Sequence, residues 1–307
     1  MTGGSTAKPF LKWAGGKGQL LEVISGRFPR ELSDGMLRRY VEPFVGGGAV
    51  FFHVAQVFRF DEIILIDANE ELVLTWCAIR DAVEPLIKRL RGVLYQYMSL
   101  AQAGQQKLFL ETRDAFNNGR PHYDFKNPPE GGVERAAQVI FLNRTCFNGL
   151  FRVNNRALFN VPFGKYKSPS ICDAKNLRQV STLLQGVRIE CADFERAAEY
   201  VDRETFVYLD PPYRPISRTA SFNSYAAGAF GDEEQRRLAS FYTSMDARGA
   251  KLQLSNSDPR NENPDDDFFD RLYEQFTIER VPATRCINSN PEKRGAIMEI
   301  LVRNYRR

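Results

Sequence analysis

Short apolar runs and one helical pattern alternate in the N-terminal part of the chain. Residues 40–44 (YVEPF) form an apolar run that ends in a glycine turn at 46–48. Residues 49–58 follow with the apolar spacing of a helix, and residues 63–66 (IILI) have the composition of a fully buried strand that stops at Asp67. A strand, a turn, a helix and a second strand form a βαβ unit, which predicts a parallel sheet.

Long helical patterns replace this alternation after residue 74. They cover residues 72–94, where Pro85 is expected to mark a boundary, and residues 107–117. Residues 141–175 are irregular, and two apolar runs within them are expected to pair as a β-hairpin, namely 150–153 and 158–161.

Strand-like runs return in the last part of the chain, at residues 187–190, 206–209, 252–255 and 297–302. Strands at both ends with helices between them predict an α/β fold whose sheet is interrupted by a mainly helical insertion. The expected domains are a sheet domain made of residues 1–73 and 176–307 and an inserted domain at 74–175.

The composition is that of a folded protein from a reducing compartment. The 307 residues are 43% hydrophobic and 26% charged, which excludes a disordered or fibrous chain. No apolar stretch is long enough to span a membrane and the first residues lack the apolar core of a signal peptide, so a cytoplasmic protein is expected. The five cysteines are scattered and there are only two histidines, which argues against a metal site and against histidine general-base chemistry.

The formal net charge of +4 hides an uneven distribution. Residues 74–175 contain 15 basic and 8 acidic residues, a net charge of +7, whereas residues 1–73 carry −1 and residues 176–307 carry −2. Between Glu134 and Asp173 there are six basic residues and no acidic one. A basic insertion on a slightly acidic body is expected when one module follows nucleic-acid phosphates and the other holds a cofactor.

The glycine turn and Asp67 together suggest an adenosine-containing cofactor. Gly46 and Gly48 follow Phe44, where glycines allow a tight turn and a close approach of the backbone to a ligand. Asp67 comes 19 residues after Gly48, at the end of the next strand, where a carboxylate can accept hydrogen bonds from both ribose hydroxyls. The turn is too short for GxGxxG and lacks a P-loop lysine, so no pyrophosphate is expected. An ordinary turn at the start of a helix is the alternative.

A DPPY motif comes directly after the second of the C-terminal strand-like runs. The Asp210 carboxylate and a nearby proline carbonyl can both accept hydrogen bonds from an exocyclic amine. Pro211 and Pro212 hold this geometry, and Tyr213 offers a ring face to a planar base. Accepting both N–H bonds directs the nitrogen lone pair toward an electrophilic methyl group, with neither a metal nor a histidine. A rigid turn that ends a strand is the alternative.

Six segments carry a family resemblance, namely 12–17 (KWAGGK), 44–48 (FVGGG), Asp67, 143–152 (NRTCFNGLFR), 159–166 (FNVPFGKY) and 210–213 (DPPY). In this order they resemble the Dam-type DNA adenine-N6 methyltransferases whose recognition domain lies between the cofactor and catalytic motifs, over about residues 8 to 305. The resemblance implies a Rossmann-like methyltransferase sheet, with an inserted DNA target-recognition domain at 74–175 that carries the hairpin. It also implies methyl transfer from S-adenosylmethionine, leaving S-adenosylhomocysteine, to adenine N6 within GATC in duplex DNA.

The resemblance further implies roles for single residues. Trp13, Lys17, Asp67 and Asp210 match cofactor-binding positions of the family, and Asp193 with Phe194 resembles the segment that contacts the cofactor's adenine. The residues that match DNA-contacting positions are Lys12 near the target base, the wedge residues Phe147 and Asn148, the base-reading Arg152, and the hairpin contacts Leu150, Pro162 and Tyr166. Phe147 departs from the many members that carry tyrosine; it loses a hydroxyl but keeps a planar ring.

Elementary chemistry gives the hairpin a similar role. Arginine is suited to bidentate reading of guanine in the major groove, as expected for Arg152. An aromatic residue beside an asparagine can fill the gap left by an extruded base, and the adenine must be extruded because its amine is unreachable inside the stack. An ordinary surface hairpin is the alternative. Residues 288–290 (NSN), followed by Lys293 and Arg294, could form another loop near DNA or a plain surface loop.

Several other functions compete with adenine methylation. The first is the same transfer to cytosine N4, an RNA base or a protein glutamine, although aspartate at the head of the DPPY motif suits adenine. A nucleotide- or DNA-binding protein without catalysis and a dinucleotide-dependent oxidoreductase are the others; the intact motif and the short glycine turn argue against them. We predict direct in-line transfer after base flipping by an enzyme of a prokaryote or phage, with a possible restriction endonuclease acting on the same site.

Overall fold

The apolar runs of the sequence form a seven-stranded mixed sheet in the computed structural model, which describes residues 6–13, 15–154, 156–214, 230–284 and 296–306. The strands are β1 (Arg39–Glu42), β2 (Glu62–Asp67), β3 (Arg188–Cys191), β4 (Thr205–Leu209), β5 (Lys251–Ser257), β6 (Thr277–Thr284) and β7 (Ala296–Arg303). Their order is β3-β2-β1-β4-β5-β7-β6. β1 pairs in parallel with β2 and β4, and β4 with β5, whereas β7 runs antiparallel to β5 and β6. The predicted α/β fold with a parallel βαβ start is confirmed.

The chain divides into two units. The helical unit comprises Met1–Gly16, Gly46–Phe52 and Asp67–Cys191, and the strand-rich unit comprises Lys17–Val45, His53–Ile66 and Ala192–Arg307. The strand β3 lies in the helical unit, and the other strands lie in the strand-rich unit, except for Asp67 at the end of β2. The further elements of the strand-rich unit are η1 (Lys17–Gln19), α1 (Leu21–Ser25), α2 (Arg30–Ser33), η5 (Phe194–Glu199), α10 (Asp232–Ala247), η6 (Pro259–Asn261) and α11 (Phe268–Leu272). The helix α3 (Ala49–Val57) follows the glycine turn.

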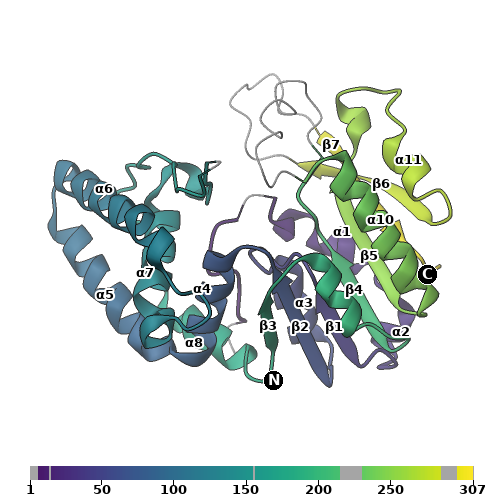
Figure 1. Ribbon diagram of the computed structural model, residues 1–307, viewed down its shortest axis with the longest axis horizontal. Helices are drawn as coiled ribbons and strands as arrows, with labels where there is room; N and C mark the ends of the chain where they lie inside the picture. Colours follow the sequence, from purple (N-terminus) through teal and green to yellow (C-terminus); the bar gives the residue numbers. More distant parts are fainter. Residues whose placement is uncertain (1–5, 14, 155, 215–229, 285–295, 307) are drawn as a thin grey trace. The chain divides into compact units, whose positions relative to one another are not determined.

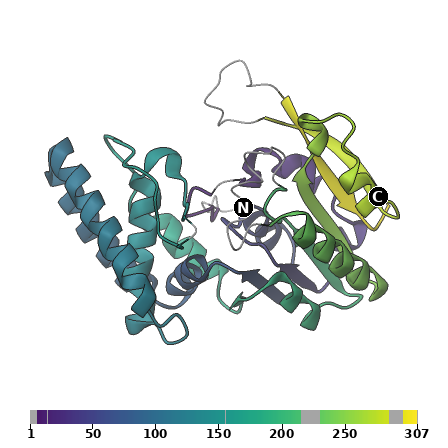
Figure 2. The same cartoon turned by 45° about the horizontal axis from the view of Figure 1, so that its top comes forward.

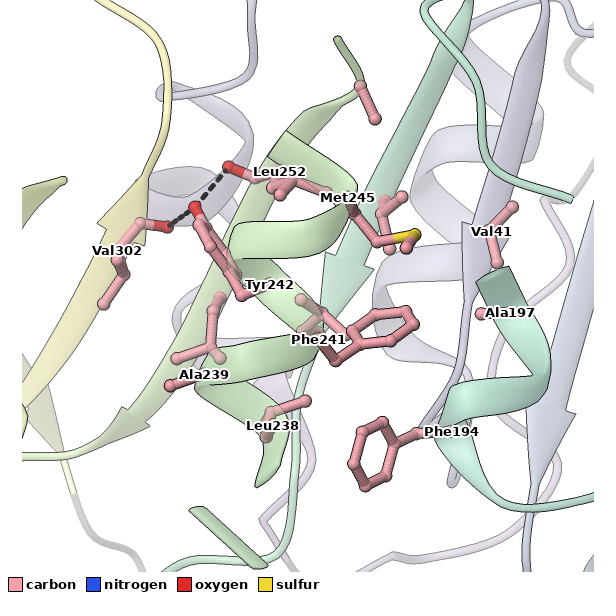
Figure 3. Close-up of a cluster of buried hydrophobic side chains, with 14 of the residues drawn as sticks. Val41, Phe194, Ala197, Leu238, Ala239, Phe241, Tyr242, Met245, Leu252 and Val302 are labelled. Atoms are coloured by element: carbon pink, nitrogen blue, oxygen red, sulfur yellow. Dashed lines mark hydrogen bonds between the residues drawn. The ribbon is translucent and has the colours of Figure 1, made fainter. Parts of the chain in front are cut away.

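The core of the strand-rich unit lies between the sheet and α10, which packs on β5 (Figure 1). Leu238, Phe241 and Met245 of α10 are buried against the apolar side chains of β1, β4 and β5. The Tyr242 hydroxyl donates to the carbonyl oxygens of Leu252 at 3.0 Å and Val302 at 3.4 Å (Figure 3). Three acidic residues in the first turn of α10 favour its N-terminus through the helix dipole. This packing fixes the strand ends that carry the candidate site.

The helical unit contains α4 (Glu70–Asp81), α5 (Val83–Ser99), α6 (Gln102–Gly119), α7 (Val133–Thr145) and α8 (Ala174–Leu183), with short turns η2 (Arg120–His122), η3 (Pro129–Gly132) and η4 (Phe147–Gly149). The helices α5, α6 and α7 lie side by side, shown in blue and teal in Figures 1 and 2. The buried Arg135 of α7 ties three helices together. Its Nε donates to Glu71 of α4 at 2.9 Å, and its Nη1 donates to the Phe116 carbonyl of α6 at 2.7 Å.

The element boundaries differ from prediction at three places. The long helical pattern breaks at Ala82, and Pro85 falls in the first turn of α5, where a missing N–H leaves no helical hydrogen bond unmade. The helix α7 continues to Thr145, so the irregular segment begins later than residue 141. The strand β6 was not predicted from the sequence.

The predicted hairpin pairs as expected but without regular strands. Val153 and Phe159 form an isolated antiparallel bridge. The Asn154 amide donates to the Leu158 carbonyl at 2.9 Å, and the Asn160 amide donates to the Arg152 carbonyl at 3.2 Å. This short pairing holds the two arms of the hairpin in register and leaves Arg152, Val153, Arg156 and Asn160 exposed.

Candidate functional site

The glycine turn between β1 and α3 is closely packed between the two tryptophans. Gly46 and Gly48 have φ angles of +49° and +72°. A Cβ atom would lie 2.9 Å from Trp13 Nε1 at Gly46 and 2.6 Å from Trp76 Cη2 at Gly48. Trp76 Nε1 also donates to the Gly46 carbonyl at 3.2 Å. Glycine is therefore required by both backbone conformation and space, and Trp13, half-buried and stacked on Phe151 at 5.8 Å, forms one wall of the turn.

Asp67, the last residue of β2, is held by the same turn. Its Oδ2 accepts from the Gly46 amide and its Oδ1 from the Asn69 amide, each at 2.9 Å. Burial raises the pKa of Asp67, and these two backbone hydrogen bonds offset part of that rise. Each carboxylate oxygen keeps lone-pair capacity for a further donor, so the side chain is suited to bind a pair of hydroxyls.

Asp210 is the first residue after β4, and its carboxylate is fixed on one oxygen. Asp210 Oδ1 lies 2.8 Å from Lys17 Nζ and accepts from the Ser255 hydroxyl at 3.1 Å. Burial raises the pKa of Asp210, and Lys17 and Ser255 oppose that rise. Among the described residues no donor contacts Oδ2, and the side chain is 21% exposed. The site therefore presents one open carboxylate oxygen.

Lys17 joins Asp210 to Tyr213 and to a glutamate that the sequence did not indicate. The Lys17 ammonium, 2% exposed, donates to the Tyr213 hydroxyl at 2.6 Å. The Tyr213 hydroxyl in turn donates to Glu299 Oε1 of β7 at 2.7 Å. Burial alone would lower the pKa of Lys17, but Asp210, the tyrosines 213 and 208, and Glu299 raise it well above its ordinary value, so Lys17 stays charged.

The two prolines of the motif differ in their carbonyl bonding. Gln235 Nε2 donates to the Pro212 carbonyl at 3.1 Å, and its Oε1 accepts from Asn256 Nδ2 at 3.3 Å. Gln235 and Asn256 are completely buried, so these hydrogen bonds attach the motif to the protein interior. Among the described residues no donor contacts the Pro211 carbonyl, so this carbonyl is the available one.

Phe44, Asp193 and Phe194 form a further cluster in the strand-rich unit. The Phe44 and Phe194 rings stack at 5.4 Å, and the Arg237 guanidinium lies 4.4 Å over Phe194. Asp193 caps η5 by accepting from the Glu195 amide at 3.0 Å, and it also pairs with Arg237. Phe194 is buried, whereas Asp193 is the polar end of the cluster.

In the helical unit, Asn143 connects the N-terminal segment to the turn after α7. Its Oδ1 accepts from the Lys12 amide at 2.9 Å, and its Nδ2 donates to the carbonyls of Lys12 at 2.7 Å and Gly149 at 2.9 Å. The Lys12 ammonium lies 4.9 Å over the Tyr166 ring. This arrangement brings the predicted DNA-contacting residues Lys12 and Tyr166 together, and it identifies Asn143 as the buried residue that anchors them.

The wedge turn presents its side chains outward. Phe147 is 54% exposed although its amide is anchored to the Pro162 carbonyl at 2.8 Å. Asn148, with a φ of +58°, is exposed, and Leu150 is half-buried. The ring of Phe147 is thus exposed on a turn whose backbone is fixed by a hydrogen bond.

Arg152 is exposed on the hairpin and paired only with a neighbour. Its Nε donates to Asn160 Oδ1 at 3.0 Å. The remaining guanidinium N–H groups make no bond to another described residue, which leaves a fork for a planar acceptor pair. Residues 288–290, with Lys293 and Arg294, lie outside the described residues.

The predicted site residues divide between the two units. The strand-rich unit brings together Lys17, Asp210, Pro211, Pro212 and Tyr213, and separately Phe44, Asp193 and Phe194, whereas the helical unit contains Lys12, Trp13, Gly46, Gly48, Asp67, Phe147, Asn148, Leu150, Arg152, Pro162 and Tyr166. Within the described ranges no cluster of His, Cys, Asp or Glu could hold a metal ion. No helix there is long and apolar enough to cross a membrane.

Comparisons with known proteins agree with this set of features. Residues 13–287 match the model of the D12 class N6 adenine-specific DNA methyltransferase family. The chain is 47% identical to the type II methyltransferase M.MjaIII of Methanocaldococcus jannaschii, covering 97% of this chain and 99% of the relative. It is 35% identical to the type II methyltransferase M1.LlaDCHI of Lactococcus lactis subsp. cremoris (97% and 95% covered) and 31% identical to a DNA adenine methylase of Haemophilus influenzae (96% and 92%). The chain therefore belongs to the D12 class of N6 adenine-specific DNA methyltransferases.

Proposed function

We propose that the enzyme methylates the adenine of GATC in duplex DNA, after extruding that adenine, by direct transfer at Asp210. Bound S-adenosylmethionine supplies an electrophilic methyl group on a positively charged sulfur. The residues present fit this cofactor: the turn at Gly46 and Gly48 has no room for a side chain, and Asp67 keeps acceptor capacity for ribose hydroxyls. Trp13, Phe44, Asp193 and Phe194 supply the aromatic and polar groups expected around the adenosine.

Asp210 and the Pro211 carbonyl are proposed to receive the target amine. Among the described residues, Asp210 Oδ2 and Pro211 O accept no hydrogen bond, whereas the Pro212 carbonyl already accepts one from Gln235, so we assign the amine to the first two acceptors. Two acceptors on one amine hold both N–H bonds and point the lone pair away from the base ring. With S-adenosylmethionine bound, this nitrogen would accept the methyl group, S-adenosylhomocysteine would be the leaving group, and N6 would release one proton to solvent. The observation that carries the proposed chemistry is that the Pro211 carbonyl accepts no hydrogen bond from another described residue.

Lys17 is proposed to keep Asp210 ionised and in place. Its ammonium lies on Oδ1 and thus leaves Oδ2 for the amine. A carboxylate in a low-dielectric site is a strong acceptor only while it remains charged, and an adjacent cation stabilises that form. The ring of Tyr213, anchored by its hydroxyl, offers a stacking face for the extruded adenine.

Recognition of the sequence is assigned to the helical unit. The exposed ring of Phe147, with Asn148, is suited to occupy the space left by the extruded base. Arg152 has a free guanidinium fork for the O6 and N7 atoms of guanine. Lys12, Leu150, Pro162 and Tyr166 are proposed as flanking DNA contacts. The relatives named DNA adenine methylase support adenine as the target base.

Two relatives have type II methyltransferase names, which fits a restriction endonuclease acting on the same site as a partner in the cell. A DNA-modifying enzyme of this kind is proposed to work in the cytoplasm of a prokaryote or phage-infected cell.

The test is methyl transfer from labelled cofactor to duplexes that carry GATC, GATG or no site. We expect label on the GATC duplex alone. Equal labelling of all three would refute the sequence specificity, and no labelling would refute the proposed reaction.

A further inference from the structure

Glu299 is a buried carboxylate in an apolar strand. It lies in β7, directly opposite Ser257 of β5, and it is 6% exposed. The next residues along the strand, Ile300, Leu301 and Val302, are completely buried apolar side chains. Burying a charge lowers stability unless partners compensate for lost hydration. The presence of a glutamate at this position must therefore be explained by the partners of its carboxylate.

Those partners are both catalytic-site residues. Glu299 Oε1 accepts from the Tyr213 hydroxyl at 2.7 Å, and Oε2 lies 3.5 Å from Lys17 Nζ. Oε2 is buried and makes no hydrogen bond to another described residue, and the same holds for the hydroxyl of Ser257. Most buried polar atoms in proteins have a hydrogen-bond partner, so the unbonded Oε2 calls for an explanation. Glu299 is instead held at a distance at which its charge acts on Lys17.

We propose that Glu299 is a positioning residue of the methyl-transfer site, which acts on Asp210 through Lys17 and Tyr213. This inference rests on the function proposed above. Its hydrogen bond fixes the Tyr213 ring, on which the extruded base would stack. Its charge shares the Lys17 ammonium with Asp210, so that one cation stands between two carboxylates and does not neutralise Asp210 completely.

The charges around Asp210 determine the direction in which Glu299 shifts the pKa of Asp210. Asp210 faces Lys17 of η1, Ser255 of β5, Glu299 of β7, and the phenols of Tyr208 and Tyr213. Burial raises the pKa of Asp210, Lys17 lowers it and Glu299 raises it again. Removing the charge of Glu299 should therefore lower the pKa of Asp210. The carboxylate becomes a weaker acceptor but stays ionised to lower pH.

The decisive variant is Glu299→Gln, which keeps an oxygen for the Tyr213 hydroxyl and removes the charge. The single-turnover rate constant should fall by about tenfold or more, because small displacements of reacting groups have effects of this order. The affinities for S-adenosylmethionine and for DNA should not change. The acid limb of the rate profile should move to lower pH. The matched control is Glu279→Gln, which removes a carboxylate of β6 that binds Arg27 and Arg303 and does not contact Lys17.

Two outcomes would overturn the proposal: an unchanged rate constant, or a loss that is equal at every pH and parallels a fall in melting temperature. If Glu299→Gln does not fold, Glu299→Asp decides. The shorter side chain should reduce the rate constant without weakening either ligand, and a wild-type rate would refute the role. If the wild-type enzyme labelled cytosine N4 instead of adenine N6, the proposed function would fail, while the Glu299 comparison would still report on that amine.

Discussion

The proposed catalytic and DNA-recognition residues are built on opposite physical principles. At the catalytic cluster, side chains bond to side chains, and Lys17 is 2% exposed among three oxygen partners. In the recognition turn, a hydrogen bond to Pro162 anchors the backbone of Phe147 while its ring is 54% exposed, and in the hairpin Arg152 is exposed and bonds, among the described residues, to Asn160 alone. The first arrangement is preorganised for chemistry. The second supplies groups that become satisfied only when DNA binds.

The segment that contains the recognition residues and the rest of the chain also differ in net charge. Residues 74–175 carry a net +7, whereas residues 1–73 and 176–307 carry −1 and −2. The excess of basic residues therefore lies in the segment that we propose to bind DNA. The acidic balance elsewhere matches a site whose central cation, Lys17, is shared between carboxylates. Substitutions should accordingly separate catalysis from binding.

The largest effect is expected for Asp210→Ala. The target amine loses its charged acceptor, so methyl transfer should fall by at least about 100- to 1000-fold, the range found when one preorganised polar group is removed from an active site. DNA affinity should remain close to wild type, because only the contact to the target amine is lost and every predicted contact of the turn, the hairpin and Lys12 is kept. Single-turnover labelling and fluorescence-anisotropy titration measure the two quantities. A parallel loss of both would show that the two functions are not separable.

Arg152→Ala should act on discrimination. Loss of a bidentate contact to guanine is expected to remove about 1–3 kcal/mol of preference at one base pair. The measurement is the ratio of kcat/KM on GATC to that on duplexes changed at a single position. Arg156→Ala, an exposed arginine in the same hairpin, is the matched control. Equal losses on cognate and altered duplexes would exclude base reading by Arg152.

Phe147→Ala should reduce base extrusion by a similar or smaller amount. Stacking of an aromatic ring on a base is worth about 1–3 kcal/mol, part of which the neighbouring Asn148 can retain. The signal is the fluorescence of 2-aminopurine placed at the target adenine. Val153→Ala removes another exposed apolar side chain nearby and should leave the signal unchanged. Full fluorescence with Phe147→Ala would refute the wedge role.

The smallest effect is expected for Lys167→Ala, an exposed lysine in the acid-free stretch of the recognition segment. Loss of one phosphate contact should lower the slope of log affinity against log salt by about 1 without changing sequence preference. Lys107→Ala, whose ammonium pairs with Glu111 on α6, is the control. An unchanged slope would place Lys167 away from the phosphates.

Much of the sheet could be predicted because its central strands are buried on both faces and read as nearly continuous apolar runs. The edge strand β6 could not. It contains Pro282 and carries Glu279 and Arg280 on adjacent positions, and a sequence with a proline and paired charges is tolerated only at a sheet edge. The boundary expected at Pro85 lies instead at Ala82, because a proline is tolerated in the first turn of a helix and Pro85 therefore does not end one.

The candidate site was accessible from the sequence only where its chemistry is contiguous. Asp210 and Tyr213 lie in one short motif, and the glycine turn is visible as three adjacent glycines. Glu299 gave no local signal, and Asn143, although it begins the segment 143–152 that carries the resemblance, was given no role of its own. Each looks like an ordinary polar residue in a strand or helix. Their significance depends on burial and on partners far along the chain, Lys17 and Tyr213 for Glu299, and Lys12 for Asn143.

Methylation of the GATC adenine at N6 is tested most directly by determining which base is modified and at which position. A duplex with one GATC and other adenines and cytosines outside it would be incubated with enzyme and S-adenosylmethionine, then digested and analysed by mass spectrometry. We expect N6-methyladenine at the GATC adenine and at no other position. N4-methylcytosine, or N6-methyladenine spread over all adenines, would contradict it.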